Sequence, residues 1–149
     1  MWKHVNAQRS QPGLLLRMQR EARVISQQHR GLDDFYQRVS TALHAGESER
    51  ARAAFARFAD ALEAHLALED GLYFPALRGL APALERDLEA LSDEHQQLRE
   101  RLASVARAIE SEACEPCARL LGQLAGELAE HEGREEGLLA SIQKRGRGR

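Results

Sequence analysis

The sequence contains one histidine–glutamate phrase twice, as HLALEDGL at residues 65–72 and as HEGREEGL at residues 131–138. Both stretches read H-x-x-x-E-[D/E]-G-L, and they begin 66 residues apart. Residues four apart on a helix lie on the same face, one turn from each other. If both stretches are helical, His65 shares a face with Glu69, and His131 shares a face with Glu135.

The apolar residues around both phrases recur at alternating spacings of three and four, which is typical of the seam of a bundle helix. Breaks containing Gly or Pro divide this pattern into four stretches, at residues 14–44, 48–77, 83–111 and 117–143. The seam of the third stretch repeats that of the first at an offset of 66, and the fourth repeats the second in the same way. We therefore predict an all-α, up-down-up-down four-helix bundle built from two repeated helical hairpins.

The composition agrees with one helical domain. The chain has 149 residues, 30% of them charged and only 5% aromatic, and Val, Ile and Thr are scarce. We expect a short N-terminal arm at residues 1–13, the bundle at 14–143, and a basic, disordered tail at 144–149. Four glycines make the last stretch the weakest predicted helix, since each costs about 1 kcal/mol against alanine.

Charge and hydropathy argue against two classes of partner. The net charge is -2, so no global positive field favours nucleic acid. No stretch approaches the ~20 apolar residues of a membrane span, and none resembles the apolar core of a signal peptide. We therefore expect a cytoplasmic protein that binds neither nucleic acid nor membranes.

Each of the four seams contains one histidine at an equivalent position: His29, His65, His95 and His131. In an antiparallel hairpin, two residues are level when they are equidistant from the turn. The midpoints between successive histidines are residues 47, 80 and 113, and each lies in a predicted loop. The four imidazoles and the two glutamates of the repeated phrase should then meet in one layer of the core.

Such a layer is better suited to binding metal ions than to stabilising the core of a bundle. A buried ionised carboxylate costs several kcal/mol unless it is paired or binds a cation. Six nitrogen and oxygen ligands are too many for one tetrahedral zinc ion. They suit two ions, each with two imidazoles, bridged by Glu69 and Glu135. Iron is favoured, and manganese or zinc is the alternative. The competing interpretation is four ordinary core histidines with two surface glutamates.

This pattern resembles the hemerythrin-like family, also called the HHE cation-binding domain. The resemblance covers about residues 14–143 and rests on His29, on the two H-x-x-x-E motifs, and on the E-H-x-x-L at Glu94, His95 and Leu98. It implies a non-haem di-iron centre bridged by the two glutamates and by an oxo or hydroxo group. It also implies binding of dioxygen, nitric oxide or peroxide, or a role in iron sensing and repair.

One position departs from the oxygen-carrying members of that family. They have a fifth histidine one turn after the histidine of the third helix, and this chain has Arg99 there. The departure argues against simple reversible oxygen carriage. The chain is more similar to members with four histidines and two glutamates, which are linked to nitrosative stress, iron-centre repair or iron sensing.

Three functions are therefore in competition. The first is a di-iron protein that binds or reduces a small oxidant in a stress response, and whether it is an enzyme stays open. The second is an iron-dependent sensor or iron-donor module that acts through a protein partner. The third is a metal-free bundle that only mediates protein contacts. We also expect a homodimer if Trp2 and Leu14–Leu16 form an exposed apolar patch.

Three acidic or phenolic side chains are further candidates near the layer. Asp33 lies one turn after His29 and is an extra ligand, a hydrogen-bond partner of an imidazole, or a surface acid. Tyr36, one turn further, is a hydrogen-bond donor to a bound oxygen species, an electron-transfer residue, or core. Glu136, like Asp70, directly follows a glutamate of the motif, and should either support a ligand from outside or lie on the surface. It is the alternative ligand if the glycine-rich fourth helix is irregular.

The two cysteines form a C-x-x-C pair, Cys114 and Cys117, which we expect in the turn before the fourth helix. Such a pair is redox-active, or half of a zinc site completed by His44 or by another chain, or simply two loop thiols. His44 is predicted to lie in a loop, outside the layer of histidines.

Overall fold

The computed structural model describes residues 11–111 and 114–147, and no strand occurs among them. The predicted all-α class is therefore confirmed. Four long helices are α1 (Gln11–His44), α2 (Ser48–Leu68), α4 (Glu85–Glu110) and α5 (Cys114–Arg147). Three short segments join α2 to α4: the π-helical η1 (Glu69–Tyr73), α3 (Phe74–Leu80) and the 3₁₀ segment η2 (Pro82–Leu84).

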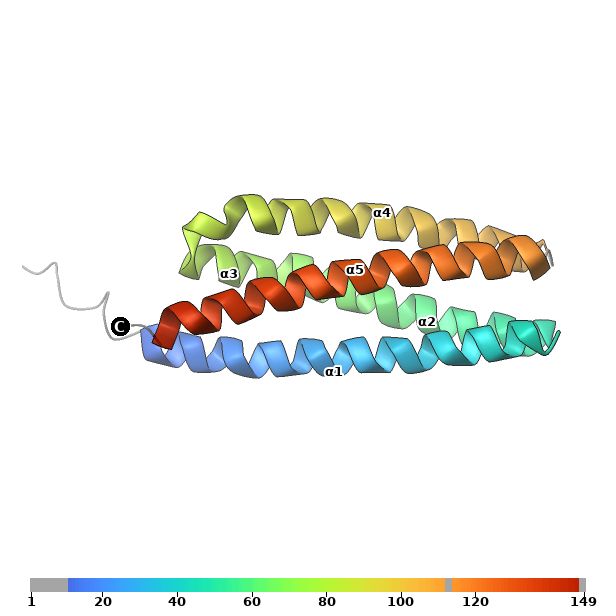
Figure 1. Cartoon of the computed structure of the whole chain (residues 1–149), viewed down its shortest axis with the longest axis horizontal. Coiled ribbons are helices and arrows are strands. Elements are labelled where there is room, and N and C mark those ends of the chain that lie inside the picture. The colour runs from blue at the N-terminus through green and yellow to red at the C-terminus, as the bar shows by residue number, and fades with distance from the viewer. Residues whose placement is uncertain (1–10, 112–113, 148–149) are drawn as a thin grey trace, which may run out of the picture.

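The long helices lie side by side along one axis of the molecule (Figure 1). In this view α1 runs along the long axis of the molecule, α2 and α3 return beside it, α4 runs forward again, and α5 returns. α1 packs against α2 and α5, and α4 packs against α5 and α2. This arrangement is consistent with a four-helix bundle, in which every long helix buries its seam against two neighbours.

The turn between α1 and α2 shows how the chain reverses direction. Gly46 has φ 70, which glycine adopts readily because it lacks a Cβ. The Gly46 N–H donates to the carbonyl of Leu43, and the Glu47 N–H donates to the carbonyl of Ala42, at 3.1 and 3.0 Å. These two bonds form a Schellman cap, which satisfies the last carbonyls of α1. The short turn then places α2 against α1.

The predicted helix 48–77 is not continuous, and this corrects the sequence interpretation. α2 ends at Leu68, one π-helical turn follows, and α3 begins at Phe74. Pro75 explains the irregularity, because it has no N–H for the bond to the carbonyl four residues earlier and its ring crowds that carbonyl. The equivalent residue in the second repeat is Ser141, and α5 remains α-helical there. π-helical turns of this kind occur frequently at functional sites.

Two predicted ends also differ from the structure. α5 begins at Cys114 instead of residue 117, so the two cysteines lie in the first turn of a helix and not in a loop. Pro116 is tolerated there because the N–H groups of a first turn have no partner within the helix. α5 also continues to Arg147, so the predicted boundary at 143–144 lies inside it. Residues 1–10, most of the predicted arm, lie outside the described residues.

The buried residues form two apolar clusters with a polar layer between them. One cluster lies toward the Gly46 turn and includes Leu32, Phe58, Leu62, Leu98 and Leu128. The other lies toward the opposite end and includes Ile25, Tyr73, Phe74, Leu88 and Leu91. Along α1, α2 and α4, the histidine of each seam falls between residues of the two clusters. The structure therefore surrounds the polar layer with apolar packing on both sides.

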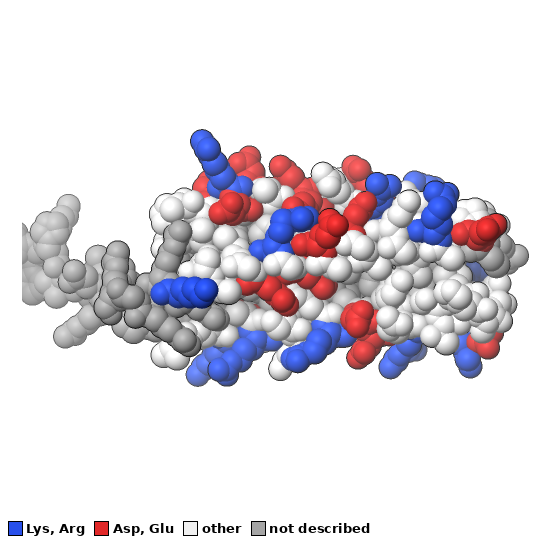
Figure 2. Space-filling model, in the orientation of Figure 1, with Lys and Arg blue, Asp and Glu red and all other residues white. Residues whose placement is uncertain are grey.

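The surface is mixed in charge. Figure 2 shows Lys and Arg side chains interspersed with Asp and Glu over one face. None of the described helices is long and apolar enough to cross a membrane. Leu16 is 59% exposed, but Trp2 lies outside the described residues, as do the side chains of Leu14 and Leu15. The proposed apolar patch and the homodimer therefore stay predictions.

Candidate metal centre

The polar layer contains all six residues of the predicted ligand set. α1 contributes His29, α2 His65, η1 Glu69, α4 His95, and α5 both His131 and Glu135. Each of these side chains is 0–6% exposed. Glutamate side chains are almost never buried this completely unless they are paired or bind a cation.

The six residues form two groups that share Glu135. Glu69, His95, His131 and Glu135 form one group, and His29, His65 and Glu135 form the other. In each group, one ligand atom from every residue lies within 4.8 Å of the others. The distance from His65 Nε2 to Glu69 Oε1 is 2.7 Å. Glu135 lies between the groups, with carboxylate oxygens 3.4 Å from His29 Nε2 and from His131 Nε2.

Each imidazole is oriented by an oxygen outside the layer. The Nδ1 of His65 lies 2.6 Å from Gln28 Oε1, and that of His95 lies 2.8 Å from Asp70 Oδ1. The Nδ1 of His131 lies 2.7 Å from Glu94 Oε2, and that of His29 lies 3.2 Å from Glu136 Oε1. A carboxylate or amide oxygen only accepts hydrogen bonds, so each Nδ1 donates. The Nε2 lone pair of every neutral imidazole then faces the centre, as in metal-binding histidines.

Several atoms of the layer lack hydrogen-bond partners among the described residues. They are both carboxylate oxygens of Glu69 and of Glu135, and the Nε2 atoms of His29 and His65. A buried polar atom without a partner costs about 1–3 kcal/mol. The Nε2 atoms of His95 and His131 lie 3.1 Å apart, and two lone pairs at that distance repel unless a proton or cation lies between them. This donor set fits bound cations.

The two glutamates have opposite pKa shifts. Burial raises the pKa of Glu69 to about 11, and the neighbouring Glu135 adds to the effect. Burial also acts to raise the pKa of Glu135, but the close approach of His131, His29 and Glu69 outweighs burial and lowers that pKa. Without a cation, these opposite shifts predict that the pair holds one proton, with Glu69 as its expected carrier. A cation would replace this proton and stabilise both carboxylates in their ionised form.

The histidines also differ from one another. Burial lowers the pKa of His65 to about 4, so this imidazole is neutral at pH 7. Burial and the neighbouring His131 lower the pKa of His95. Burial alone would lower the pKa of His29 and of His131, but the neighbouring carboxylates, with Glu135 first, raise both pKa values.

These shifts predict how the stability of the metal-free protein depends on pH. Folding raises the pKa of Glu69 from 4.5 to about 11, so its stabilising contribution is complete below pH 4.5 and is lost as pH rises toward 11. The raised pKa values of His29 and His131 act in the same direction above pH 6.5. His65, whose pKa falls to about 4, adds no slope above pH 7. The melting temperature in chelator should therefore fall from pH 7 to pH 9.

The variant Glu69→Gln cannot ionise and should lose most of this slope. Glu89→Gln is the matched control, since Glu89 is exposed on α4. Thermal melts at three pH values, followed by circular dichroism, measure the effect. An equal slope in Glu69→Gln and in the native chain would show that Glu69 does not hold the proton.

The other candidates take different places. Asp33 is exposed and belongs to neither group of ligand atoms. Tyr36 packs against the apolar cluster, as the core interpretation expects. Asp33 and Tyr36 both line a cavity of about 90 Å³ beside His29. Glu136 is 53% exposed and supports His29 from outside, because α5 is regular and leaves Glu135 facing inward.

Sequence reasoning missed three residues of the site. Gln28 contacts His65, which is 37 residues away, and no local pattern indicates this contact. Glu94 was noted as part of a motif but not as the partner of His131. Glu132 lines the cavity beside His29, and burial raises its pKa to about 7. Its position next to His131, on a partly buried helix face, was the only available signal.

The cysteine pair is only partly described. Cys117 is 1% exposed and packs in the apolar cluster near the Gly46 turn. The side chain of Cys114 lies outside the described residues. His44 is exposed at the end of α1, and its Nδ1 lies 2.8 Å from the carbonyl oxygen of Ser40. A redox function of the pair stays a prediction.

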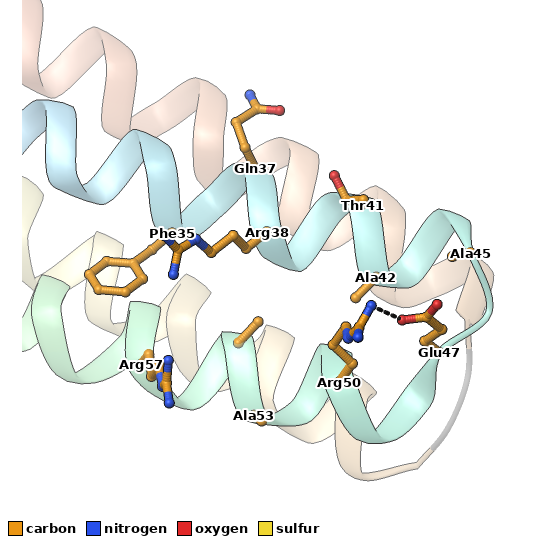
Figure 3. Close-up of a pocket in the computed structure, with 11 residues that line it drawn as sticks. Phe35, Gln37, Arg38, Thr41, Ala42, Ala45, Glu47, Arg50, Ala53 and Arg57 are labelled. Carbon is orange, nitrogen blue, oxygen red and sulfur yellow. Dashed lines mark ion pairs between the residues drawn. The ribbon is translucent and has the colours of Figure 1, made fainter.

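A larger hollow lies between α1 and α2 near the Gly46 turn (Figure 3). It has a volume of about 490 Å³, and Phe35, three arginines and several alanines line it. Arg50 pairs with Glu47 at 2.8 Å, and Arg38 lies over the ring of Phe35. None of the six residues of the polar layer lines this hollow, so it is separate from the candidate metal centre.

Four inward-facing imidazoles and two buried carboxylates in the middle of a helical bundle define a metal-binding helical protein. The family model described as the hemerythrin HHE cation binding domain matches residues 21–142. The chain therefore belongs to this family, as predicted, and the matched range includes all six residues of the layer. Comparison with curated proteins gives no significant match, and neither does comparison with solved structures.

Proposed function

We propose that this chain holds two iron ions in the polar layer and that the loaded site binds or reduces a small oxidant in a cytoplasmic stress response. The oxidant would be dioxygen, nitric oxide or peroxide. The observation that carries the proposal is the convergence of four Nε2 atoms on two carboxylates whose oxygens have no other partner. Bound iron would supply a redox-active centre with positions open to a small ligand.

The proposed roles of the six residues follow their grouping. His95 and His131 would hold one ion, and His29 and His65 the other. Glu69 and Glu135 would lie between the ions as bridging ligands, and the family resemblance adds an oxo or hydroxo bridge. Iron is favoured because imidazole and carboxylate donors suit it and the family resemblance implies it, and manganese or zinc is the alternative.

The surroundings of the layer support a small ligand. The cavity beside His29 has a volume of about 90 Å³, and Leu32, Phe58 and Leu128 form apolar parts of its wall. A liquid water molecule occupies roughly 30 Å³, so this space admits a diatomic molecule or peroxide and excludes larger organic substrates. The apolar wall would also limit the access of bulk water to the centre.

An iron-dependent sensor or iron-donor module is the second candidate. It is favoured by the unpaired atoms of the layer, because a core with this many unsatisfied groups gains stability when a cation binds. The loaded and metal-free forms would then differ in rigidity, and a protein partner could recognise the loaded form. Arg99, in place of a fifth histidine, agrees with either candidate.

The test begins with metal-free protein loaded with ferrous iron under anaerobic conditions. We expect about two iron atoms per chain by plasma mass spectrometry, as the six donors require. Addition of nitric oxide, hydrogen peroxide or dioxygen should then change the absorption spectrum, and consumption of the oxidant is followed in parallel. Stoichiometric iron without any response to the three oxidants would favour the sensor or donor function. Absence of stoichiometric metal would contradict both candidates.

A further inference from the structure

The imidazoles of His95 and His131 are both held by carboxylates. Asp70 accepts from His95 at 2.8 Å, and Glu94 accepts from His131 at 2.7 Å. These carboxylates are only 32% and 21% exposed. Each is oriented by an arginine, with Arg99 Nη2 3.4 Å from Asp70 Oδ2 and Arg134 Nε 2.8 Å from Glu94 Oε1.

The imidazoles of His29 and His65 are held differently. His65 donates to the neutral amide oxygen of Gln28 at 2.6 Å. His29 donates to Glu136 at 3.2 Å, and this carboxylate is 53% exposed, so water screens its charge. The two histidine pairs therefore have the same donor atoms toward the centre but different acceptors behind them. His95 and His131 have partly buried carboxylates, each paired with an arginine, whereas His65 has a neutral amide and His29 an exposed carboxylate.

That difference should act on metal affinity. A carboxylate behind an imidazole N–H makes the opposite nitrogen a stronger donor than a neutral amide does, and changing such a partner alters metal affinity about 10–100-fold. The glutamates do not distinguish the two pairs, because Glu135 belongs to both groups and Glu69 Oε1 lies 2.7 Å from His65 Nε2 and 3.7 Å from His95 Nε2. Glu132 adds negative charge near His29 and acts in the opposite direction, but it belongs to neither group of converging atoms.

From these contacts we infer that the two proposed metal positions are unequal. The position of His95 and His131 binds a divalent cation first and holds it, and the position of His29 and His65 takes up and releases its cation more readily. The cavity beside His29, whose lining includes the exposed Asp33, lies next to this second position. This inference rests on the proposed dinuclear site and identifies the ion that a donor function would hand over.

The experiment is an anaerobic titration of the metal-free protein with Co²⁺, followed by absorption and by competition with a chromophoric chelator. We expect two steps with dissociation constants at least about 10-fold apart. Gln28→Glu should tighten the weaker step about 10-fold and leave the tighter step unchanged, because it places a carboxylate behind His65. Asp70→Asn should weaken the tighter step about 10–100-fold.

Gln27→Glu is the matched control, since it adds the same charge on α1 at an exposed neighbouring residue. It should change neither step by more than about twofold, as expected for a screened surface charge. If Gln28→Glu does not fold, as judged by circular dichroism, Gln28→Ala serves instead and should weaken only the weaker step.

The outcomes separate this inference from the proposed function. Two equal steps in the native chain would overturn the inference and leave the dinuclear site intact. A change confined to the tighter step in Gln28→Glu would also overturn it, because the order of the positions would be reversed. Failure to bind Co²⁺ or ferrous iron at all would contradict the proposed function itself.

Discussion

Replacing Glu69 and Glu135 together by alanine should remove both metal ions from the chain. The native protein is expected to hold about two iron atoms after anaerobic loading, and the double variant almost none. The physical reason is charge, because two divalent cations held only by four neutral imidazoles would leave four uncompensated positive charges in an apolar core. Such charges cost several kcal/mol each. Plasma mass spectrometry after removal of free iron measures the effect.

The control is the double variant Glu89→Ala with Glu130→Ala, which removes two exposed glutamates from α4 and α5. It should retain about two iron atoms, since neither residue belongs to the layer. Circular dichroism checks that both double variants are helical. Retention of two ions by the Glu69 and Glu135 variant would show that these carboxylates are not ligands.

Each single variant should also reduce the content of both ions. Glu135 belongs to both groups of converging atoms, and Glu69 Oε1 lies 2.7 Å from His65 Nε2 and 3.7 Å from His95 Nε2. Glu135→Ala and Glu69→Ala therefore each remove a donor from both positions, and plasma mass spectrometry measures the loss.

Metal removal should lower the melting temperature of the chain by roughly 15 to 30 °C. A cation present at 1,000 times its dissociation constant adds about 4 kcal/mol to the free energy of unfolding, so two ions add about 8 kcal/mol. In a domain of this size, each kcal/mol moves the melting temperature by roughly 2–4 °C. The effect is large because the cations satisfy buried atoms that otherwise have no partner.

Thermal melts of the loaded protein, with and without a chelator, measure this difference. The double variant of Glu69 and Glu135 is the control, and chelator should leave its melting temperature unchanged because it holds no metal. If chelator also leaves the melting temperature of the native chain unchanged, the chain is a metal-free bundle. That is the third function considered from the sequence.

The helices and the composition of the polar layer could be predicted because they follow from regular geometry. An apolar seam with spacings of three and four predicts which face of each helix is buried. Equal distances from the turns then place His29, His65, His95 and His131 at one level. The structure brings all four together with Glu69 and Glu135, and their role as ligands stays a prediction.

Local irregularity could not be predicted in the same way. The break of the second helix at Leu68 depends on how the packed structure accommodates Pro75. A proline at that position is equally compatible with the end of a helix. The continuity of α5 through its glycines depends on packing against neighbouring helices, which outweighs their weak helix propensity. Its start at Cys114 and its end at Arg147 lie beyond the stretch that the seam predicted.

The sequence by itself determined the helical class, the family and the six residues of the layer, because helix periodicity and repeat spacing are properties of the chain alone. Only the tertiary structure decided which oxygen stands behind each imidazole. Gln28 reaches His65 across 37 residues, and Glu136 reaches His29 across 107. Such contacts depend on the rotation and spacing of packed helices, which no local pattern encodes. The proposed inequality of the two metal positions arises entirely from these contacts.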